Sequence, residues 1–192
     1  MTQPPRRRAR PKAVLSGLLS AALAVGAVLA FGGPAATAEA AQSMTHGLKG
    51  EYFLSSGAGT DDLATLKATR LDAAVNFADL NPAYLELTGR NTDTAARWTG
   101  QIQPEFTENY TFYAIGDNGF RVWIDGALVI DHWQKDWDNE QTSAAVALTA
   151  GERYDIKVEQ FQEAGGSNMY LRWSSPSVAK QIIPATAYYA PE

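Results

Sequence analysis

The chain has 192 residues, with 16 basic and 21 acidic side chains and a formal net charge of −5 at pH 7. It contains no cysteine, which excludes disulfides, thiolate metal sites and cysteine-based catalysis. An acidic chain lacks the general positive field that attracts nucleic acid or anionic membranes. The length allows one domain beyond any targeting segment.

Residues 1–40 have the organisation of a secretory signal peptide followed by a short linker. Basic residues at positions 6–12 precede a largely apolar run from Ala13 to Phe31, and small residues come after it. This order predicts cleavage after Ala38 or Ala40. A membrane anchor is the alternative, because the apolar run approaches the length that spans a bilayer. The glycines of the segment, Pro34 and the adjacent cleavage motif favour removal, and hence a secreted protein without stable membrane insertion.

Removal of the segment up to Ala38 makes the chain more acidic. The remaining chain has 11 basic and 21 acidic residues, a net charge of −10. This charge is compatible with cation binding.

The stretch from Tyr110 to Trp133 is the most informative part of the predicted domain. It contains three apolar runs, Tyr110–Ile115, Phe120–Ile124 and Ala127–Ile130, which are separated by Gly116-Asp117-Asn118-Gly119 and by Asp125-Gly126. Asn-Gly and Asp-Gly tolerate the positive φ angles of tight hairpin turns. Alternate residues of the second run are apolar, as in a strand with one buried face. We therefore expect a three-stranded antiparallel meander.

The rest of the predicted domain, residues 45–190, also indicates strands. Further strands are expected at 45–54, 97–104, 144–148, 154–161, 169–173 and 181–189, the last interrupted by Pro184. Residues 63–76 are predicted to be irregular, Asn81-Pro82 to form a turn, and residues 162–167 to form a hairpin loop. Many short strands with Gly, Pro and Asn between them predict an all-β antiparallel sandwich or barrel.

Six motifs occur in an order that resembles the protective-antigen domain family, PA-14. They are GLKGEYF near the start of the domain, RWTGQI (97–102), YTFYAIGDNGFRVWIDGALVID (110–131), LTAGERYDIKVEQF (148–161), LRWSSPS (171–177) and IIPATAYY (182–189). The resemblance covers residues 45–189 and implies a β-sandwich-like barrel. The family occurs in bacterial toxins, glycosidase inserts and fungal adhesins, where it often binds carbohydrate, in many cases through calcium.

The resemblance implies a calcium site at Asp117 and Asn118. In the sugar-binding members, two aspartates joined by a cis peptide hold the ion, with an asparagine from a second loop and backbone carbonyls. Asn118 departs from this pattern, so one negative charge is missing and calcium would bind more weakly. In the second loop, Glu163 or Asn168 would supply an oxygen. The alternative is that Asp117-Asn118-Gly119 is only a turn.

For each of the other polar and aromatic candidates, a structural role is the alternative to a functional one. Trp133 and Trp137 lie in a polar loop and are candidates to stack on a sugar ring, although loop tryptophans often pack into the core. Trp98, Trp123 and Trp173 lie in predicted strands, where core packing is expected. Asp61-Asp62 is expected to be solvated. His46 and His132 lack the spacing of a metal site.

These features predict a secreted, non-catalytic module that binds a glycan, with calcium at the Asp117-Asn118 loop. The alternative is a protein-interaction or structural module without a sugar site. A third alternative is a small glycoside hydrolase, because that reaction needs only two carboxylates. No motif of an enzyme active site is present in the sequence. No nucleic-acid partner is expected, and the sequence does not identify a protein partner.

Overall fold

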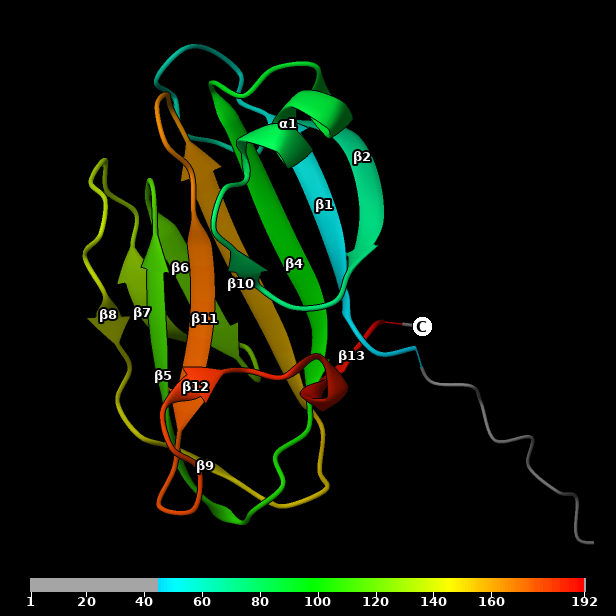
Figure 1. Cartoon of the computed structure of the whole chain (residues 1–192), viewed down its shortest axis with the longest axis vertical. Helices are drawn as coiled ribbons and strands as arrows, with labels where there is room; N and C mark the ends of the chain where they lie inside the picture. Colours follow the sequence, from blue (N-terminus) through cyan, green and yellow to red (C-terminus); the bar gives the residue numbers. More distant parts are fainter. Residues whose placement is uncertain (1–44, 192) are drawn as a thin grey trace, which may run out of the picture. The chain divides into compact units, whose positions relative to one another are not determined.

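The computed structural model of the chain describes residues 45–191. The predicted signal peptide, residues 1–40, lies outside the described residues. The described part is built from two antiparallel β-sheets that face each other, with one short α-helix at the edge (Figure 1). The prediction of an all-β antiparallel sandwich is confirmed.

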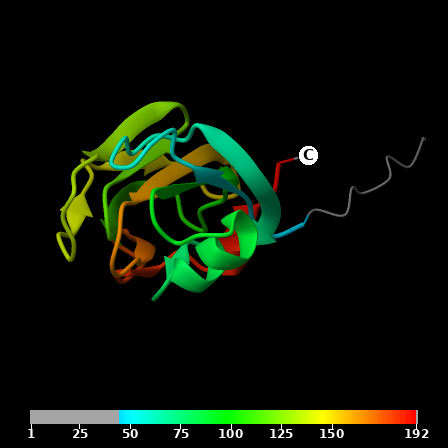
Figure 2. The same cartoon turned by 90° about the horizontal axis from the view of Figure 1, so that it is seen from above.

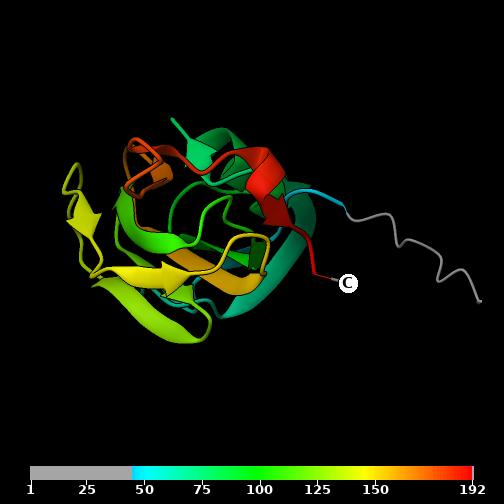
Figure 3. The same cartoon turned by 90° about the horizontal axis from the view of Figure 1, so that it is seen from below.

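The larger sheet has seven strands. Its order is β2 (Thr65–Asp72), β1 (Leu48–Leu54), β4 (Thr94–Ile102), β10 (Tyr154–Gln162), β6 (Phe120–Ile124) and β7 (Ala127–His132), and β13 (Tyr188–Tyr189) pairs with the end of β4. Figure 3 shows the lower end of the sandwich, where the chain approaches its C-terminus.

The smaller sheet has six strands. Its order is β12 (Gln181–Ile182), β11 (Met169–Ser174), β5 (Glu108–Gly116) and β8 (Gln141–Thr142); β3 (Asn76–Phe77) pairs with β11, and β9 (Val146–Leu148) with β5. Two helical segments complete the domain, the α-helix α1 (Asn81–Thr88) and the 3-10 helix η1 (Ala185–Ala187).

The core lies between the two sheets, because the central strands bury every second side chain. In β6 the buried residues are Phe120, Val122 and Ile124, and in β11 they are Met169, Leu171 and Trp173. Burial of a large apolar side chain contributes about 1.5–3 kcal/mol. A core of this kind stabilises the fold without disulfides.

The expected three-stranded meander is wrong at its first connection. β5 belongs to the smaller sheet and β6 to the larger one, so residues 117–119 carry the chain across the sandwich. None of residues 116–119 has a positive φ. Residues 163–168 likewise connect β10 of the larger sheet to β11 of the smaller one, and do not form the expected hairpin loop.

The second half of the expected meander is confirmed. β6 and β7 pair directly, with Ile124 opposite Ala127, and the two residues between them have positive φ angles, 49° at Asp125 and 78° at Gly126. Asp-Gly therefore forms the tight turn that the sequence predicts.

Two further predictions are wrong. Residues 63–76 were expected to be irregular but contain β2, an edge strand whose side chains are mostly exposed, so no apolar alternation marks it. Asn81-Pro82 was expected to be a turn but begins α1, because proline is well tolerated in the first helical turn. Gly89 ends the helix with a φ of 85°.

The three tryptophans that lie in strands differ in their burial. Trp98 and Trp173 are buried in the core as expected, at 0% and 4% exposure. Trp123 is not, because it lies on the outer face of β6, where the Lys157 ammonium sits 3.6 Å from its ring centroid. Within residues 45–191, no helix is both long enough and apolar enough to cross a bilayer.

Candidate functional site

Two crossings between the sheets lie next to each other at one end of the sandwich. They are residues 117–119, between β5 and β6, and residues 163–168, between β10 and β11 (Figure 2). The Asp117 N–H donates to the Asn168 carbonyl at 3.1 Å, and the Asn118 N–H donates to the Phe161 carbonyl at 3.0 Å. The peptide bond between Asp117 and Asn118 is cis, as the family resemblance implied.

The Asp117 carboxylate has no basic partner among the described residues. Its one side-chain hydrogen bond comes from the Asn118 amide nitrogen, at 3.0 Å. Partial burial raises the pKa of Asp117, and the negative charge of Asp138 raises it further. An anionic oxygen held near a second carboxylate without a basic partner favours a bound cation.

Asn118 is buried and connects the two crossings. Its side-chain oxygen accepts a hydrogen bond from the Glu163 N–H at 2.8 Å, while its amide nitrogen contacts Asp117. An amide oxygen has two lone pairs, so one stays available to a metal. In the described structure, the observed contacts of the Asn118 side chain hold the two loops together.

Asn168 and Glu163 differ in what their oxygens already contact. The side-chain oxygen of Asn168 is buried without a hydrogen-bond donor. The Glu163 carboxylate instead lies 3.1 Å from the Lys135 ammonium. Of the two candidates in the second loop, Asn168 is therefore the one with an unpartnered oxygen.

Asp138 was not among the site residues predicted from the sequence. It lies in the loop of residues 133–140, which connects β7 to β8 and approaches Asp117 closely enough for its charge to act on the carboxyl group. No ion pair or hydrogen bond of its carboxylate is found among residues 45–191. Its left-handed backbone, with φ 54°, is a loop feature that the sequence alone does not mark. We call Asp117, Asn118, Asp138 and Asn168 the loop site.

The two loop tryptophans have different environments. Trp133 packs against Phe161, with ring centroids 4.8 Å apart, and donates from its indole nitrogen to the Asp61 carbonyl at 3.1 Å. Trp137 is 67% exposed and precedes Asp138 by one residue. Trp137 is thus the tryptophan that offers an open ring beside the loop site.

The other polar candidates have structural contacts. Asp62 accepts hydrogen bonds from the Ser56 N–H and hydroxyl within its own loop, both at 2.7 Å. His132 is buried beside Phe120 and contacts Asp136 at 2.7 Å, and His46 contacts the Tyr188 carbonyl at 2.9 Å.

The oxygens of the loop site fit calcium better than any softer metal. Carboxylate, amide and carbonyl oxygens are the ligands that calcium prefers, and nitrogen and sulfur ligands are absent from the site. Among the described residues, no group of three or more His, Cys, Asp or Glu side chains could hold a metal. A calcium ion here would therefore rely on two carboxylates, amide or backbone oxygens, and oxygens from water or a ligand.

The chain belongs to the PA14 domain family, whose model matches residues 45–187. Fold and sequence agree on this: the sandwich, the cis peptide in the first crossing and the facing second loop all lie within the matched residues. The predicted resemblance is confirmed.

Similar proteins come from different contexts. The chain is 36% identical over 143 residues to "Anti-sigma-I factor RsgI3" of Acetivibrio thermocellus, and 25% identical over 158 residues to "Protective antigen" of Bacillus anthracis. The matches cover 74% and 79% of this chain. The chain spans about a fifth of the length of these curated relatives, 21% and 19%.

Solved structures show the same fold. An anti-sigma factor domain-containing protein from Clostridium clariflavum is 38% identical, with a TM-score of 0.69, over 77% of this chain and 48% of that one. A "PA14 sugar-binding domain from RTX adhesin" is 17% identical, with a TM-score of 0.61, over 77% of this chain and 99% of that one. At that identity, the adhesin likeness shows the fold alone.

Proposed function

We propose that this PA14 domain is a secreted, non-catalytic module that binds a glycan through a calcium ion at the loop site. Asp117 and Asp138 supply the two carboxylates, and Asn168 and Asn118 supply amide oxygens. Calcium takes six to eight oxygen ligands at about 2.3–2.6 Å. Neighbouring hydroxyls of a sugar would complete the shell.

One observation carries the proposal: the segments that carry Asp117, Asp138 and Asn168 come close together at this end, and no basic side chain among the described residues pairs with their oxygens. The Asp117 and Asp138 carboxylates have no basic partner within the described residues, and the Asn168 oxygen is buried without a hydrogen bond. Buried polar atoms normally have partners, so an unpartnered amide oxygen in this loop is suited to bind a cation. Trp137 supplies an exposed indole beside it for the apolar face of a sugar ring.

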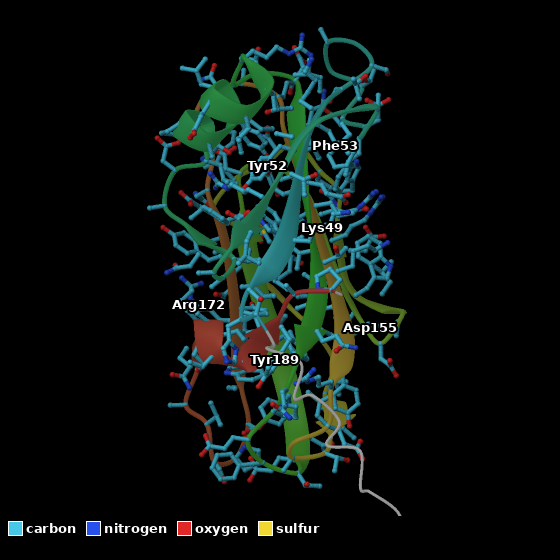
Figure 4. The ribbon with its side chains drawn as sticks, turned by 90° about the vertical axis from the view of Figure 1, so that its right-hand side faces the viewer. Lys49, Tyr52, Phe53, Asp155, Arg172 and Tyr189 are labelled. Atoms are coloured by element: carbon cyan, nitrogen blue, oxygen red, sulfur yellow. The ribbon has the colours of Figure 1, made fainter. Side chains whose placement is uncertain are left out.

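Calcium titration of the domain by calorimetry tests the proposal. We expect saturable binding in the wild type, loss of that binding in Asp117→Ala, and tighter binding in Asn118→Asp because affinity follows ligand charge. Asp155→Ala is the matched control, since this carboxylate contacts Gln101 at the other end of the sheet (Figure 4). Sugars with vicinal hydroxyls are then screened with and without calcium.

The absence of calcium heat in the wild type at millimolar concentrations would contradict the calcium mechanism. Sugar binding that ignores chelator would also contradict it. Those results would favour the alternative of an interaction module without a sugar site. The match to the anti-sigma factor relatives covers only part of each of those longer proteins, which is compatible with that alternative.

A further inference from the structure

The helix α1, with the residue that precedes it, is hydrogen-bonded directly to one crossing of the loop site and through Gln160 of β10 to the other. No residue of α1 was a functional candidate from the sequence, and the hydrogen bonds of its Asn81 and Tyr84 side chains go to Gly165 and Gln160 and not to a side chain of the loop site. The contacts nevertheless lead, one hydrogen bond at a time, from α1 to the backbone of Asp117 and to the loop of residues 163–168. A functional role for these contacts rests on the proposed calcium site.

The first connection runs through Tyr84 and Gln160, which are both fully buried. The Tyr84 hydroxyl donates to the side-chain oxygen of Gln160. The amide nitrogen of Gln160 donates to the Asp117 carbonyl at 2.7 Å and to the Phe161 carbonyl at 2.7 Å. Tyr84 therefore sets which way the Gln160 amide is turned, because its hydroxyl requires the oxygen on its side.

The same Phe161 residue also binds the first crossing through its backbone. Its carbonyl accepts from the Asn118 N–H at 3.0 Å, and its N–H donates to the Gly119 carbonyl at 3.0 Å. These two bonds hold Asn118 and Gly119 to β10. The Gln160 amide holds Asp117 to the same strand.

The second connection joins the start of α1 to the other crossing. The Leu80 N–H donates to the Ser167 carbonyl at 2.7 Å, and the Asn81 amide donates to the Gly165 carbonyl at 2.8 Å. These bonds fix the loop immediately before Asn168. Helix α1 is therefore linked to both halves of the site, to the second crossing directly and to the first through Gln160.

We propose that α1 is the positioning element of the loop site, with Tyr84 acting through Gln160 on the Asp117 backbone and Asn81 acting on the loop that carries Asn168. Neither residue touches the ion. Their role is to hold the two loops in place, so that the ligand oxygens are already at a fixed distance from each other before the ion binds. Partners of this kind change metal affinity by about 10–100-fold in other proteins.

Tyr84→Phe tests the proposal because it removes one hydroxyl and keeps the ring in the core. Tyr52→Phe is the matched control: the Tyr52 ring packs edge-on against Tyr84, with centroids 5.9 Å apart, but its hydroxyl donates to Asp72 and not toward the site. Figure 4 shows Tyr52 on β1, below α1. Both variants lose one buried hydrogen bond, so both lose stability.

We expect Tyr84→Phe to weaken calcium binding about tenfold or more, and Tyr52→Phe to leave it within about twofold of the wild type. Gln160→Glu, which replaces the donor to the Asp117 carbonyl with an acceptor, should weaken it at least as much as Tyr84→Phe. Equal calcium affinities in Tyr84→Phe and Tyr52→Phe would overturn the proposal, because the loss would then follow stability alone.

Hydrogen exchange of the metal-free protein gives a readout that does not depend on calcium. The Asn118 and Phe161 amides should exchange faster in Tyr84→Phe than in Tyr52→Phe, while the Trp98 amide in the core strand β4 reports global stability in both. If the wild type binds no calcium, the proposed calcium-dependent function fails, and this comparison still decides whether Tyr84 positions the loop. Unchanged exchange at Asn118 and Phe161 would overturn the positioning role.

Discussion

Asp117 illustrates how a single side chain is held in a state that disfavours its own charge. Partial burial and the nearby charge of Asp138 both raise the pKa of Asp117, and no basic residue among those described compensates. The loop keeps a carboxylate that costs the metal-free fold some stability. A residue with this property is useful to a cation site and has no evident use in a turn.

The sign of this effect predicts a pH-dependent change in stability. Because the folded pKa of Asp117 lies above the unfolded value, its contribution to stability is present below the unfolded pKa, about 3.9, and is lost as the pH rises through the folded pKa. In chelator, Asp117→Asn should therefore be more stable than the wild type at pH 7, and the difference should vanish near pH 3. Urea unfolding at the two pH values measures it.

Asp62→Asn is the control with the opposite sign. Hydrogen bonds from the Ser56 side chain and backbone lower the pKa of Asp62, so its charged form is favoured in the fold. This substitution should slightly reduce stability at pH 7, and the loss should disappear as the pH falls through the lowered pKa. A stability of Asp117→Asn below that of the wild type at pH 7 would contradict the interpretation of Asp117.

At the scale of secondary-structure elements, the connections between strands determine which sheet each strand joins. The same kind of Gly-rich motif forms a tight hairpin at Asp125-Gly126 but a crossing between sheets at residues 117–119. The difference lies in backbone geometry, since Asp125 and Gly126 have positive φ angles and the residues of the crossing do not. The hairpin turn therefore requires glycine at position 126, and the free energy of unfolding of a substituted variant measures this requirement.

Gly126→Ala should destabilise the domain by about 1–2 kcal/mol, the cost of a left-handed backbone for a residue with a Cβ. The φ of Gly126 is 78°, and an added Cβ would meet no atom within 4 Å, so the cost is conformational only. Gly57→Ala is the matched control, because Gly57 is not in the left-handed region and has room for a Cβ. Chemical denaturation measures both. Equal free energies of unfolding for the two variants would contradict this assignment.

At the scale of the whole molecule, a buried carboxylate ties β2 to the centre of the larger sheet. Asp72 accepts from the Tyr52 hydroxyl at 2.7 Å, from the Trp98 indole at 2.8 Å and from the Arg70 guanidinium at 2.7 Å. Gly50 makes room for it, since a Cβ there would lie 2.1 Å from a carboxylate oxygen. The cluster joins three strands that are distant in the sequence.

Asp72→Ala should destabilise the whole domain by about 3–5 kcal/mol, because two buried donors and a guanidinium lose their acceptor. Asp131→Ala is the comparison: its carboxylate pairs with Arg121 at 2.9 Å but is 54% exposed, and such pairs contribute less than about 1 kcal/mol. Unfolding followed by tryptophan fluorescence separates the two. A loss below about 1 kcal/mol for Asp72→Ala would show that solvent replaces the contacts.

The sequence by itself determined the fold class, the family and the position of the first site loop. The alternation of apolar residues at Phe120, Val122 and Ile124 follows from one buried face of a strand. Such a pattern is local, so it can be recognised from the sequence alone. Asp117 and Asn118 were found through six motifs in order, and the candidate Asn168 came from the loop that the same resemblance indicated. Edge strand β2 and helix α1 were missed because their stability comes from neighbours, and their own patterns are weak.

Only the tertiary structure decided which residues meet. The assignment of β5 and β6 to different sheets, the approach of Asp138 to Asp117 and the contact from Tyr84 through Gln160 all join segments that are far apart in the chain. Such contacts depend on the packing of two sheets and on loops that cross between them. No local pattern encodes them, because each residue's partner is selected by the fold as a whole.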